Sequence, residues 1–434
     1  MNPLLIGALT FVALIVLLCL RVPIAVSMLI VGSGGLLLTK GATLAFYSLS
    51  TTPASALMSF SMCTIPLFIL MGNLCNEAGL TSQLYDAGNK VLGRLPGGLA
   101  AATVFCCAGF AATTGSSVGM VAAMTRIALP EMDRYGYDRD LSLGTIAGSG
   151  TLGILIPPSI PMVMYAIATE QSVGRILLGG IFPGIIMAVA MIGYVTIRCK
   201  LHPEQAPLSK ETYTFKEKVV ALKDAWTILA LFIIVIGSIY AGIASATEAG
   251  AVGCLGALLI AFFKKRLTWK AFKSAMLDTI KMTCMILLIS MAANVFQLFL
   301  TRVGFATAFT NLFVNAHMSK TLMVIILLLV YIPLGMFFDT MGMILLTIPI
   351  FYPVMQAVGI DPIWFGVMVI IMIQISLLSP PVGLNVYVLK GCVADSTLGQ
   401  IFKSCVPWMI LELAVVALLI AFPGIILWLP NMMH

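Results

Sequence analysis

Long apolar runs, separated by short polar stretches, follow one another from the first residues of the chain to the last. A run of about 17–25 residues is long enough to cross a bilayer as a helix. The runs are continuous instead of alternating, which favours helices over the strands of a β-barrel. The pattern therefore predicts an all-α polytopic membrane protein, with full crossings at 3–20, 22–38, 58–76, 139–170, 176–197, 226–243, 246–263, 274–300, 363–392 and 405–428.

Double prolines interrupt two of these crossings. The first interruption is "ILIPPSIP" at 154–161, and the second is "LLSPPVGLN" at 377–385. Proline removes a backbone donor and obstructs the preceding helical turn. Unpaired backbone groups persist at membrane depth only beside protein or a water-filled cavity. We therefore expect 139–170 and 363–392 to be broken helices whose interruptions serve a site.

Two other segments predict re-entrant hairpins. The apolar stretches 99–112 and 118–130 flank the polar tip "TTGSS" at 113–117. Each stretch is about 13–14 residues, or about 20 Å of helix, which is short of the roughly 30 Å hydrocarbon core. We assign the first hairpin to 97–130. A second hairpin, with the tip "FFDTMG", is predicted at 321–353.

The paired features recur at one spacing, which indicates an internal duplication. The two double prolines are 223 positions apart, and the same offset relates Gly119 to Gly342, Met120 to Met343, Pro130 to Pro353, Gly136 to Gly359 and Asp138 to Asp361. We predict a first repeat at 1–200, a linker at 201–225 and a second repeat at 226–434. An odd number of crossings separates the two double prolines, so the repeats are expected to be inverted relative to each other.

The formal net charge of +7 indicates orientation and not nucleic-acid binding. Lys and Arg gather at one set of helix ends, and basic loops of membrane proteins face the cytoplasm. We therefore place 198–225 and 264–273 on the cytoplasmic side.

Inverted repeats with interrupted helices are typical of secondary transporters. The half-helix N-termini favour an anion, and free carbonyls at half-helix C-termini favour a cation. The candidate Na⁺ ligands are Thr114, Gly115, Ser116, Ser117, Asp339, Thr340, Gly342, Gly383 and Asn385. The candidate substrate-binding residues are Pro157, Pro158, Ser159, Ser379, Pro380 and Pro381. The alternative is that Ser and Thr only cap half-helices, and that Pro and Gly only shape the turns.

Asp339 is the one acid in a predicted tip. An ionisable group at membrane depth is a functional candidate, but Asp is also a favoured helix cap. Both roles stay open at this point. The sequence shows no nucleophile–base pair, no phosphate-binding loop and no metal-ligand spacing of cysteine or histidine. An enzyme and an ATP-driven pump are therefore not expected.

Several segments resemble the large membrane subunit of TRAP (tripartite ATP-independent periplasmic) transporters. They are "IPLFILMGNLCNEAGL" at 65–80, "GILIPPSIPMVMYAIAT" at 153–169, "ATEAGAVG" at 246–253 and the "PPVGLN" segment at 380–385. The resemblance implies an elevator-type architecture in the bacterial inner membrane and Na⁺-driven uptake of an organic acid, such as a C4-dicarboxylate or sialic acid. It also implies two partners: a periplasmic substrate-binding protein, and a small four-helix membrane subunit encoded as a separate chain.

Other functions remain compatible with this pattern. One is a stand-alone elevator-type dicarboxylate or citrate symporter that needs no binding protein. Another is a channel, which would pass solute downhill without saturation. In the first hairpin, Met120 and Val121 stand where some family members carry an acid, so the resemblance carries over no specific cation ligand at that point.

Overall fold

The computed structural model describes residues 2–207, 213–316 and 318–433. These described residues form helices and no strand, which confirms the all-α prediction. The helices of the first half are α1 (Pro3–Cys19), α2 (Ile24–Lys40), α3 (Ala42–Leu57), α4 (Thr64–Glu77), α5 (Leu80–Leu92), α6 (Gly98–Thr114), α7 (Ser117–Arg134), α8 (Arg139–Gly150), α9 (Ile160–Ala168), α10 (Val173–Gly179) and α11 (Ile181–Leu201). Short 3-10 turns are η1 (Phe60–Cys63), η2 (Thr151–Ile154) and η3 (Pro203–Gln205).

The second half contains a similar succession of helices. They are α12 (Phe215–Tyr240), α13 (Ala246–Phe263), α14 (Trp269–Val303), α15 (Phe305–Asn315), α16 (Lys320–Leu329), α17 (Tyr331–Leu334), α18 (Thr340–Val358), α19 (Pro362–Ser376), α20 (Leu384–Cys392), α21 (Leu398–Ala421) and α22 (Gly424–Asn431). α12 begins inside the predicted linker, because Thr214 and Glu217 form a capping box that starts a helix on polar residues. Positions 208–212 of that linker lie outside the described residues.

The offset of 223 positions also holds for the local structure. Asp138 and Asp361 cap the N-termini of α8 and α19. Ser116 and Asp339 cap α7 and α18 in the same way. Both double prolines contain a cis peptide bond. Each of these features has its counterpart at the same distance along the chain, so both halves use the same signals to start their helices.

The halves differ clearly at one place. In the first half, Ala42–Leu57 and Phe60–Glu77 are bent by 59° at a short break. The corresponding part of the second half is the single 35-residue helix α14. The break lies at 58–59, between the end of α3 and the turn η1, and α3 itself continues through Pro53.

Three helices were not predicted from the apolar runs: α3, α5 and α15. α5 is amphipathic: Leu84 and Tyr85 are buried while Ser82 and Asp86 are exposed. A search for continuous apolar runs does not detect a helix that is apolar on one face only.

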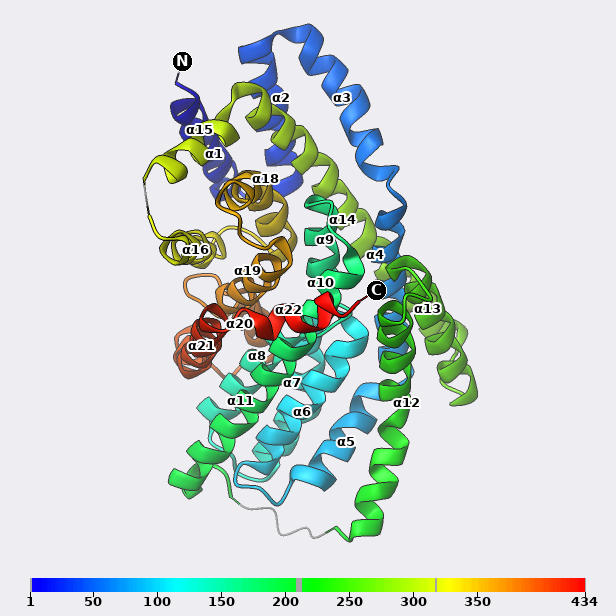
Figure 1. The fold of residues 1–434 in the computed structure, drawn as a ribbon. Helices are drawn as coiled ribbons and strands as arrows, with labels where there is room; N and C mark the ends of the chain where they lie inside the picture. Colours follow the sequence, from blue (N-terminus) through cyan, green and yellow to red (C-terminus); the bar gives the residue numbers. More distant parts are fainter. Residues whose placement is uncertain (1, 208–212, 317, 434) are drawn as a thin grey trace.

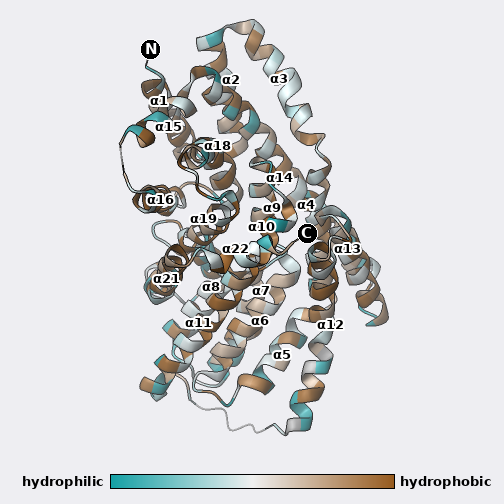
Figure 2. Ribbon diagram, in the orientation of Figure 1, coloured by the Kyte–Doolittle hydropathy of each residue, from teal (hydrophilic) through white to brown (hydrophobic). Residues whose placement is uncertain are grey.

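Hydrophobic residues run along most helices, and hydrophilic residues gather at helix ends such as the first turns of α12 (Figure 2). Five described helical segments, one of them α10 together with α11, are long and apolar enough to cross a membrane, and the bent pair adds a sixth. One of the five is α18, which lies in the predicted second hairpin and not in a predicted crossing. The remaining predicted crossings correspond to shorter apolar helices, among them α1, α2 and α19. Several predicted crossings are thus built from helices of 17 residues or fewer.

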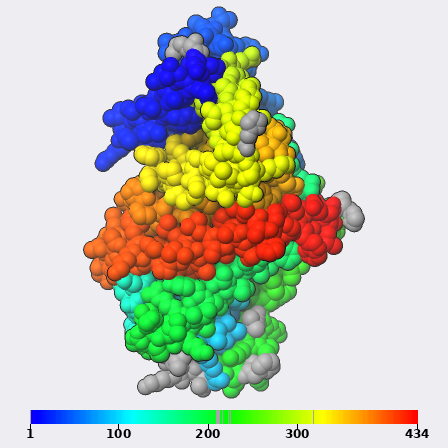
Figure 3. Space-filling view, turned by 60° about the vertical axis from the view of Figure 1, so that its left-hand side comes forward, coloured from blue at the N-terminus to red at the C-terminus, as the bar shows by residue number. Residues whose placement is uncertain are grey.

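Most helices fall into two groups (Figure 1), and α5 and α15 pack against members of both. The scaffold helices are α1–α4 and α12–α14, in which α14 packs against α2 and α4, and α13 packs against α4. The central helices are α6–α11 and α16–α22, in which α8 packs against α21, and α7 against α20. On the face in Figure 3, α21 and α22 form a broad red band, with the yellow region of α15 and α16 above it and the green α11 below. The two halves of the sequence therefore contribute to both groups.

Candidate functional site

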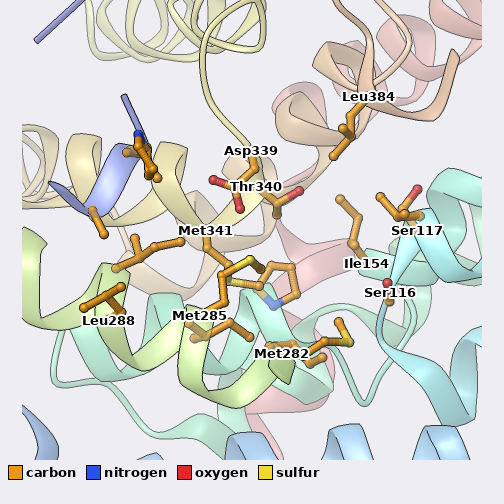
Figure 4. A pocket seen from close by; sticks show the side chains of 18 of the residues that line it. Ser116, Ser117, Ile154, Met282, Met285, Leu288, Asp339, Thr340, Met341 and Leu384 are labelled. Carbon is orange, nitrogen blue, oxygen red and sulfur yellow. The ribbon is translucent and has the colours of Figure 1, made fainter. Parts of the chain in front are cut away.

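The two hairpin tips meet at a cavity of about 700 Å³. Ser116 and Ser117 line it from the first tip, and Asp339 and Thr340 from the second. Figure 4 shows these two pairs facing the cavity from different elements, with Met282, Met285 and Leu288 of α14 beside them. One wall therefore comes from the scaffold, and the hydroxyl and carboxylate groups come from the central helices.

The first tip is shaped by backbone contacts. α6 ends at Gly115, which has a φ of 58°, and Ser116 then caps α7 by accepting a hydrogen bond from the N–H of Gly119. A Cβ atom on Gly115 would lie 2.7 Å from the carbonyl oxygen of Pro158. The tip of the hairpin and the break of the first broken helix are thus packed backbone to backbone.

Replacing Gly115 by Ala tests this close approach. The left-handed backbone costs an L-residue about 1–2 kcal/mol, and the new methyl group would also collide with the Pro158 carbonyl. We expect Gly115→Ala to lower the thermal unfolding temperature of the detergent-purified protein measurably. Gly136→Ala is the matched control, because Gly136 has a φ of 70° but nothing within 4 Å of the added Cβ. Equal losses in both variants would contradict the packing argument.

The second tip carries the acid of the site. Asp339 caps α18, and its Oδ1 accepts a hydrogen bond of 3.1 Å from the N–H of Gly342. Asp339 also lines the cavity. The sequence left open whether Asp339 is a helix cap or a functional residue of the site. The two roles are compatible, because one carboxylate oxygen accepts the capping hydrogen bond while the side chain borders the cavity.

A buried link joins the first tip to the second broken helix. The Asn385 amide donates a 2.7 Å hydrogen bond to the Ser117 hydroxyl, and a longer one of 3.4 Å to the carbonyl of Ala147. Both Asn385 and Ser117 are buried. The link fixes α7 and α20 relative to each other next to the cavity.

The other predicted Na⁺ ligands lie around the large cavity but are placed less directly on it. Thr114 lines a smaller cavity of about 90 Å³ together with Asn73 and Ser116. Gly342 lies in the first turn of α18, and Gly383, with a φ of 54°, precedes α20. Their assignment as ligands stays a prediction.

None of the six predicted substrate-binding residues lines the large cavity among the described lining residues. Ser159 is buried, accepts a bond from the N–H of Met162 and donates one of 2.5 Å to the carbonyl of Ile154. Ser379 donates a 3.0 Å bond to the carbonyl of Ser376. Pro157 and Pro158 are buried, whereas Pro380 and Pro381 are exposed. In this structure these residues shape the two breaks, and substrate binding by them stays a prediction.

Arg21 is a further residue of the site that was not among the predicted site residues. It lines the cavity, in a loop where its φ is 63°. Among the described lining residues, Arg21 and Asp339 alone carry charge. The pattern gave no direct signal for Arg21, because a basic residue between two apolar runs is the ordinary mark of a cytoplasmic loop.

Interrupted helices from both halves that converge on one cavity define a secondary transporter of the helical membrane class. Residues 11–425 match the family described as "Tripartite ATP-independent periplasmic transporter, DctM component". The chain belongs to this family. It is therefore the large permease component of a TRAP transporter, a multi-pass protein of the inner membrane, and not an enzyme.

Named relatives show the same family along nearly the whole chain. The C4-dicarboxylate TRAP transporter large permease protein DctM of Pseudomonas aeruginosa is 33% identical over 86% of this chain and 86% of its own length. The sialic acid TRAP transporter large permease protein SiaM of Vibrio cholerae is 28% identical over 94% of this chain and 95% of its own. Among solved structures, MtrF of Neisseria gonorrhoeae has a TM-score of 0.62 at 12% identity, covering 89% of this chain and 85% of that one. That likeness shows the fold alone.

Proposed function

We propose that the protein takes up an organic acid anion with Na⁺ as the coupling ion, by an elevator movement of the central helices against the scaffold. The observation that carries the proposal is the cavity between the two groups of helices, where two equivalent helix N-termini meet. C4-dicarboxylates and sialic acid are the substrate classes, because the relatives carry them in their names.

The cavity suits a carboxylate through two positive features. The N-termini of α7 and α18 both border it, and a helix N-terminus carries a partial positive charge. The guanidinium of Arg21 is exposed on the cavity lining and forms no ion pair within 4.0 Å in the described part of the chain. An entering anion would meet this charge without displacing a partner.

Na⁺ suits the oxygen atoms at the tips. Hard cations prefer oxygen ligands, and the tips supply the hydroxyls of Ser116 and Thr340, the carboxylate of Asp339 and the carbonyls at the end of α6. Asp339 also supplies the negative charge that a bound cation neutralises at membrane depth. Na⁺ would therefore screen Asp339 from the anionic substrate in the same cavity.

Hydrogen bonds hold each of the two groups of helices together. Among the described residues, bonds such as Thr64–Thr247 and Asn73–Thr279 join scaffold helices to one another, at 2.6 and 3.0 Å. Bonds such as Ser117–Asn385 join central helices. α5 belongs to neither group and is hydrogen-bonded to both: Gln83 of α5 accepts from Lys264 at the end of α13, and the carbonyl of Thr81 accepts from Sγ of Cys106 in α6 at 3.5 Å. Movement of the central helices against the scaffold would therefore have to break one of these two contacts.

The partners follow from the tripartite family. We propose that a periplasmic binding protein delivers the anion and that a small membrane subunit packs beside the large one as a separate chain. The test is uptake of radiolabelled succinate and N-acetylneuraminic acid into proteoliposomes that hold both membrane subunits. Uptake of one substrate should require its binding protein and an inward Na⁺ gradient. Uptake without the binding protein would favour the stand-alone symporter, and unsaturable flux without Na⁺ a channel.

Replacing Arg21 by Gln tests the carboxylate contact. A charged hydrogen bond contributes about 1.5–3 kcal/mol, so we expect the KM for the transported acid to rise at least about tenfold, since about 1.4 kcal/mol corresponds to that factor. Arg302→Gln is the control, because Arg302 is exposed at the end of α14 and does not line the cavity. An unchanged KM in Arg21→Gln would remove Arg21 from the substrate site.

A further inference from the structure

A buried polar cluster lies where the two broken helices cross. Thr151, in the turn η2 that follows α8, and Gln374, in α19, are separated by the repeat offset of 223 positions and bonded to each other at 2.7 Å. The third member is Glu412 of α21, whose Oε1 lies 2.7 Å from Oγ1 of Thr151. All three side chains are fully buried. Equivalent positions of the two repeats thus meet, and an acid from a neighbouring helix is attached to them.

The number of protons in this cluster decides the state of Glu412. Oγ1 of Thr151 is 2.6 Å from the carbonyl oxygen of Gly148, 2.7 Å from Oε1 of Glu412 and 2.7 Å from Nε2 of Gln374. A hydroxyl group has one proton to donate. If Glu412 were ionised, two acceptors would compete for that proton, and one short contact would join two oxygens with no hydrogen between them. Turning the Gln374 amide round adds another acceptor and makes the shortage worse.

The surroundings of the second carboxyl oxygen agree with this count. Oε2 of Glu412 is buried and has no hydrogen-bond partner in the described chain. No Lys, Arg or His lies within 4.0 Å of the carboxyl group among the described residues. An ionised carboxylate that is buried without a cation or hydrogen-bond donors is very costly. Leaving the carbonyl oxygen of a neutral carboxylic acid without a donor costs much less. Both observations require a proton on Oε1.

We propose that Glu412 is a proton-binding site: its O–H donates to Thr151, Thr151 donates to Gly148, and Gln374 donates to Thr151. The proton stays bound through the transport cycle and holds α21 to the crossing of the two interrupted helices. Glu412 is a positioning residue, because it acts on the cavity only through Thr151 and the break of the first broken helix. This assignment does not depend on which anion or cation is transported.

Infrared difference spectroscopy tests the proton directly on the purified complex of both membrane subunits. Wild type minus Glu412→Gln at neutral pH should contain the carbonyl band of a protonated carboxylic acid, which shifts in D₂O. Thr151→Val should move that band, because the acceptor of the O–H is removed. A carboxylate band in its place would overturn the proposal. The shift in Thr151→Val keeps the test valid if the Gln variant does not fold.

Transport supplies the second readout. Glu412→Gln keeps an N–H donor toward Thr151, so uptake should stay within about twofold of wild type. Glu412→Leu has a similar size but no donor, and its uptake should fall well below that of the Gln variant. If the Gln variant folds but loses Na⁺-dependent uptake, transport needs an exchangeable proton on Glu412. The proposal that this proton stays bound through the transport cycle would then be wrong. The infrared result does not depend on whether wild-type uptake requires Na⁺. Failure of the proposed function can therefore be distinguished from failure of the proton-binding proposal.

Discussion

Replacing Asp339 by Asn is expected to weaken the activation of uptake by Na⁺ without unfolding the second tip. Asn caps helices as well as Asp does, so its side-chain oxygen can still accept the hydrogen bond from the N–H of Gly342. The negative charge at the cavity is lost. We expect the Na⁺ concentration for half-maximal uptake to rise at least about tenfold, which corresponds to about 1.4 kcal/mol. The measurement is succinate or sialic acid uptake into proteoliposomes as a function of Na⁺.

The repeat supplies a matched control for this variant. Asp361 caps α19 through its Oδ1, which accepts from the N–H groups of Ile363 and Trp364 at 2.8 and 3.0 Å. It does not line the large cavity. Asp361→Asn should leave the Na⁺ dependence unchanged. If both variants respond alike, the effect arises from capping, and Asp339 is not a cation ligand.

Ser116 offers a further comparison, because it occupies the position of Asp339 in the first repeat. The two tips have the same backbone role but differ in charge, so the site is symmetric in architecture and asymmetric in chemistry. This asymmetry favours a single charged cation site at the second tip, with the first tip contributing neutral oxygens. Because the first tip has no acid, it repels the substrate carboxylate less than the second tip does.

The sequence pattern predicts most of the fold because the constraints of the bilayer are strong. The offset of 223 positions locates the second copy of each break, and the helix starts at Ser117 and Thr340 follow from a cap residue before an apolar run. Amphipathic helices such as α5 are not indicated by continuous apolar runs. The bend of 59° before α4 could not be foreseen either, because the second copy of that segment is continuous.

The candidate site is predicted less completely than the fold. Residues at the tips, such as Ser116 and Asp339, can be named because they interrupt apolar runs. Arg21 and Met282 reach the cavity only through the packing of the scaffold, which no local pattern encodes. The Glu412 cluster joins residues 261 positions apart and could be found only from the structure. Long-range packing between repeats is the information that a single sequence lacks.

A disulfide between scaffold and central helices should stop transport if the central helices move. A Cβ on Gly174 of α10 would lie 2.8 Å from Cγ2 of Ile239 in α12, and both positions are buried and away from the cavity. We expect Gly174→Cys with Ile239→Cys to lose uptake on oxidation, down to the level of liposomes without protein, and to regain it on reduction. The background carries Ser in place of the exposed cysteines, Cys19, Cys63, Cys284 and Cys392.

The control crosslink lies inside the scaffold. The hydroxyls of Thr64 in α4 and Thr247 in α13 are 2.6 Å apart, so cysteines at these two positions should also pair on oxidation. This disulfide joins helices of one body, and uptake should continue. Continued uptake with a complete Gly174–Ile239 crosslink would show that α10 does not move against α12. In that case the proposed elevator movement of the central helices against the scaffold would be contradicted.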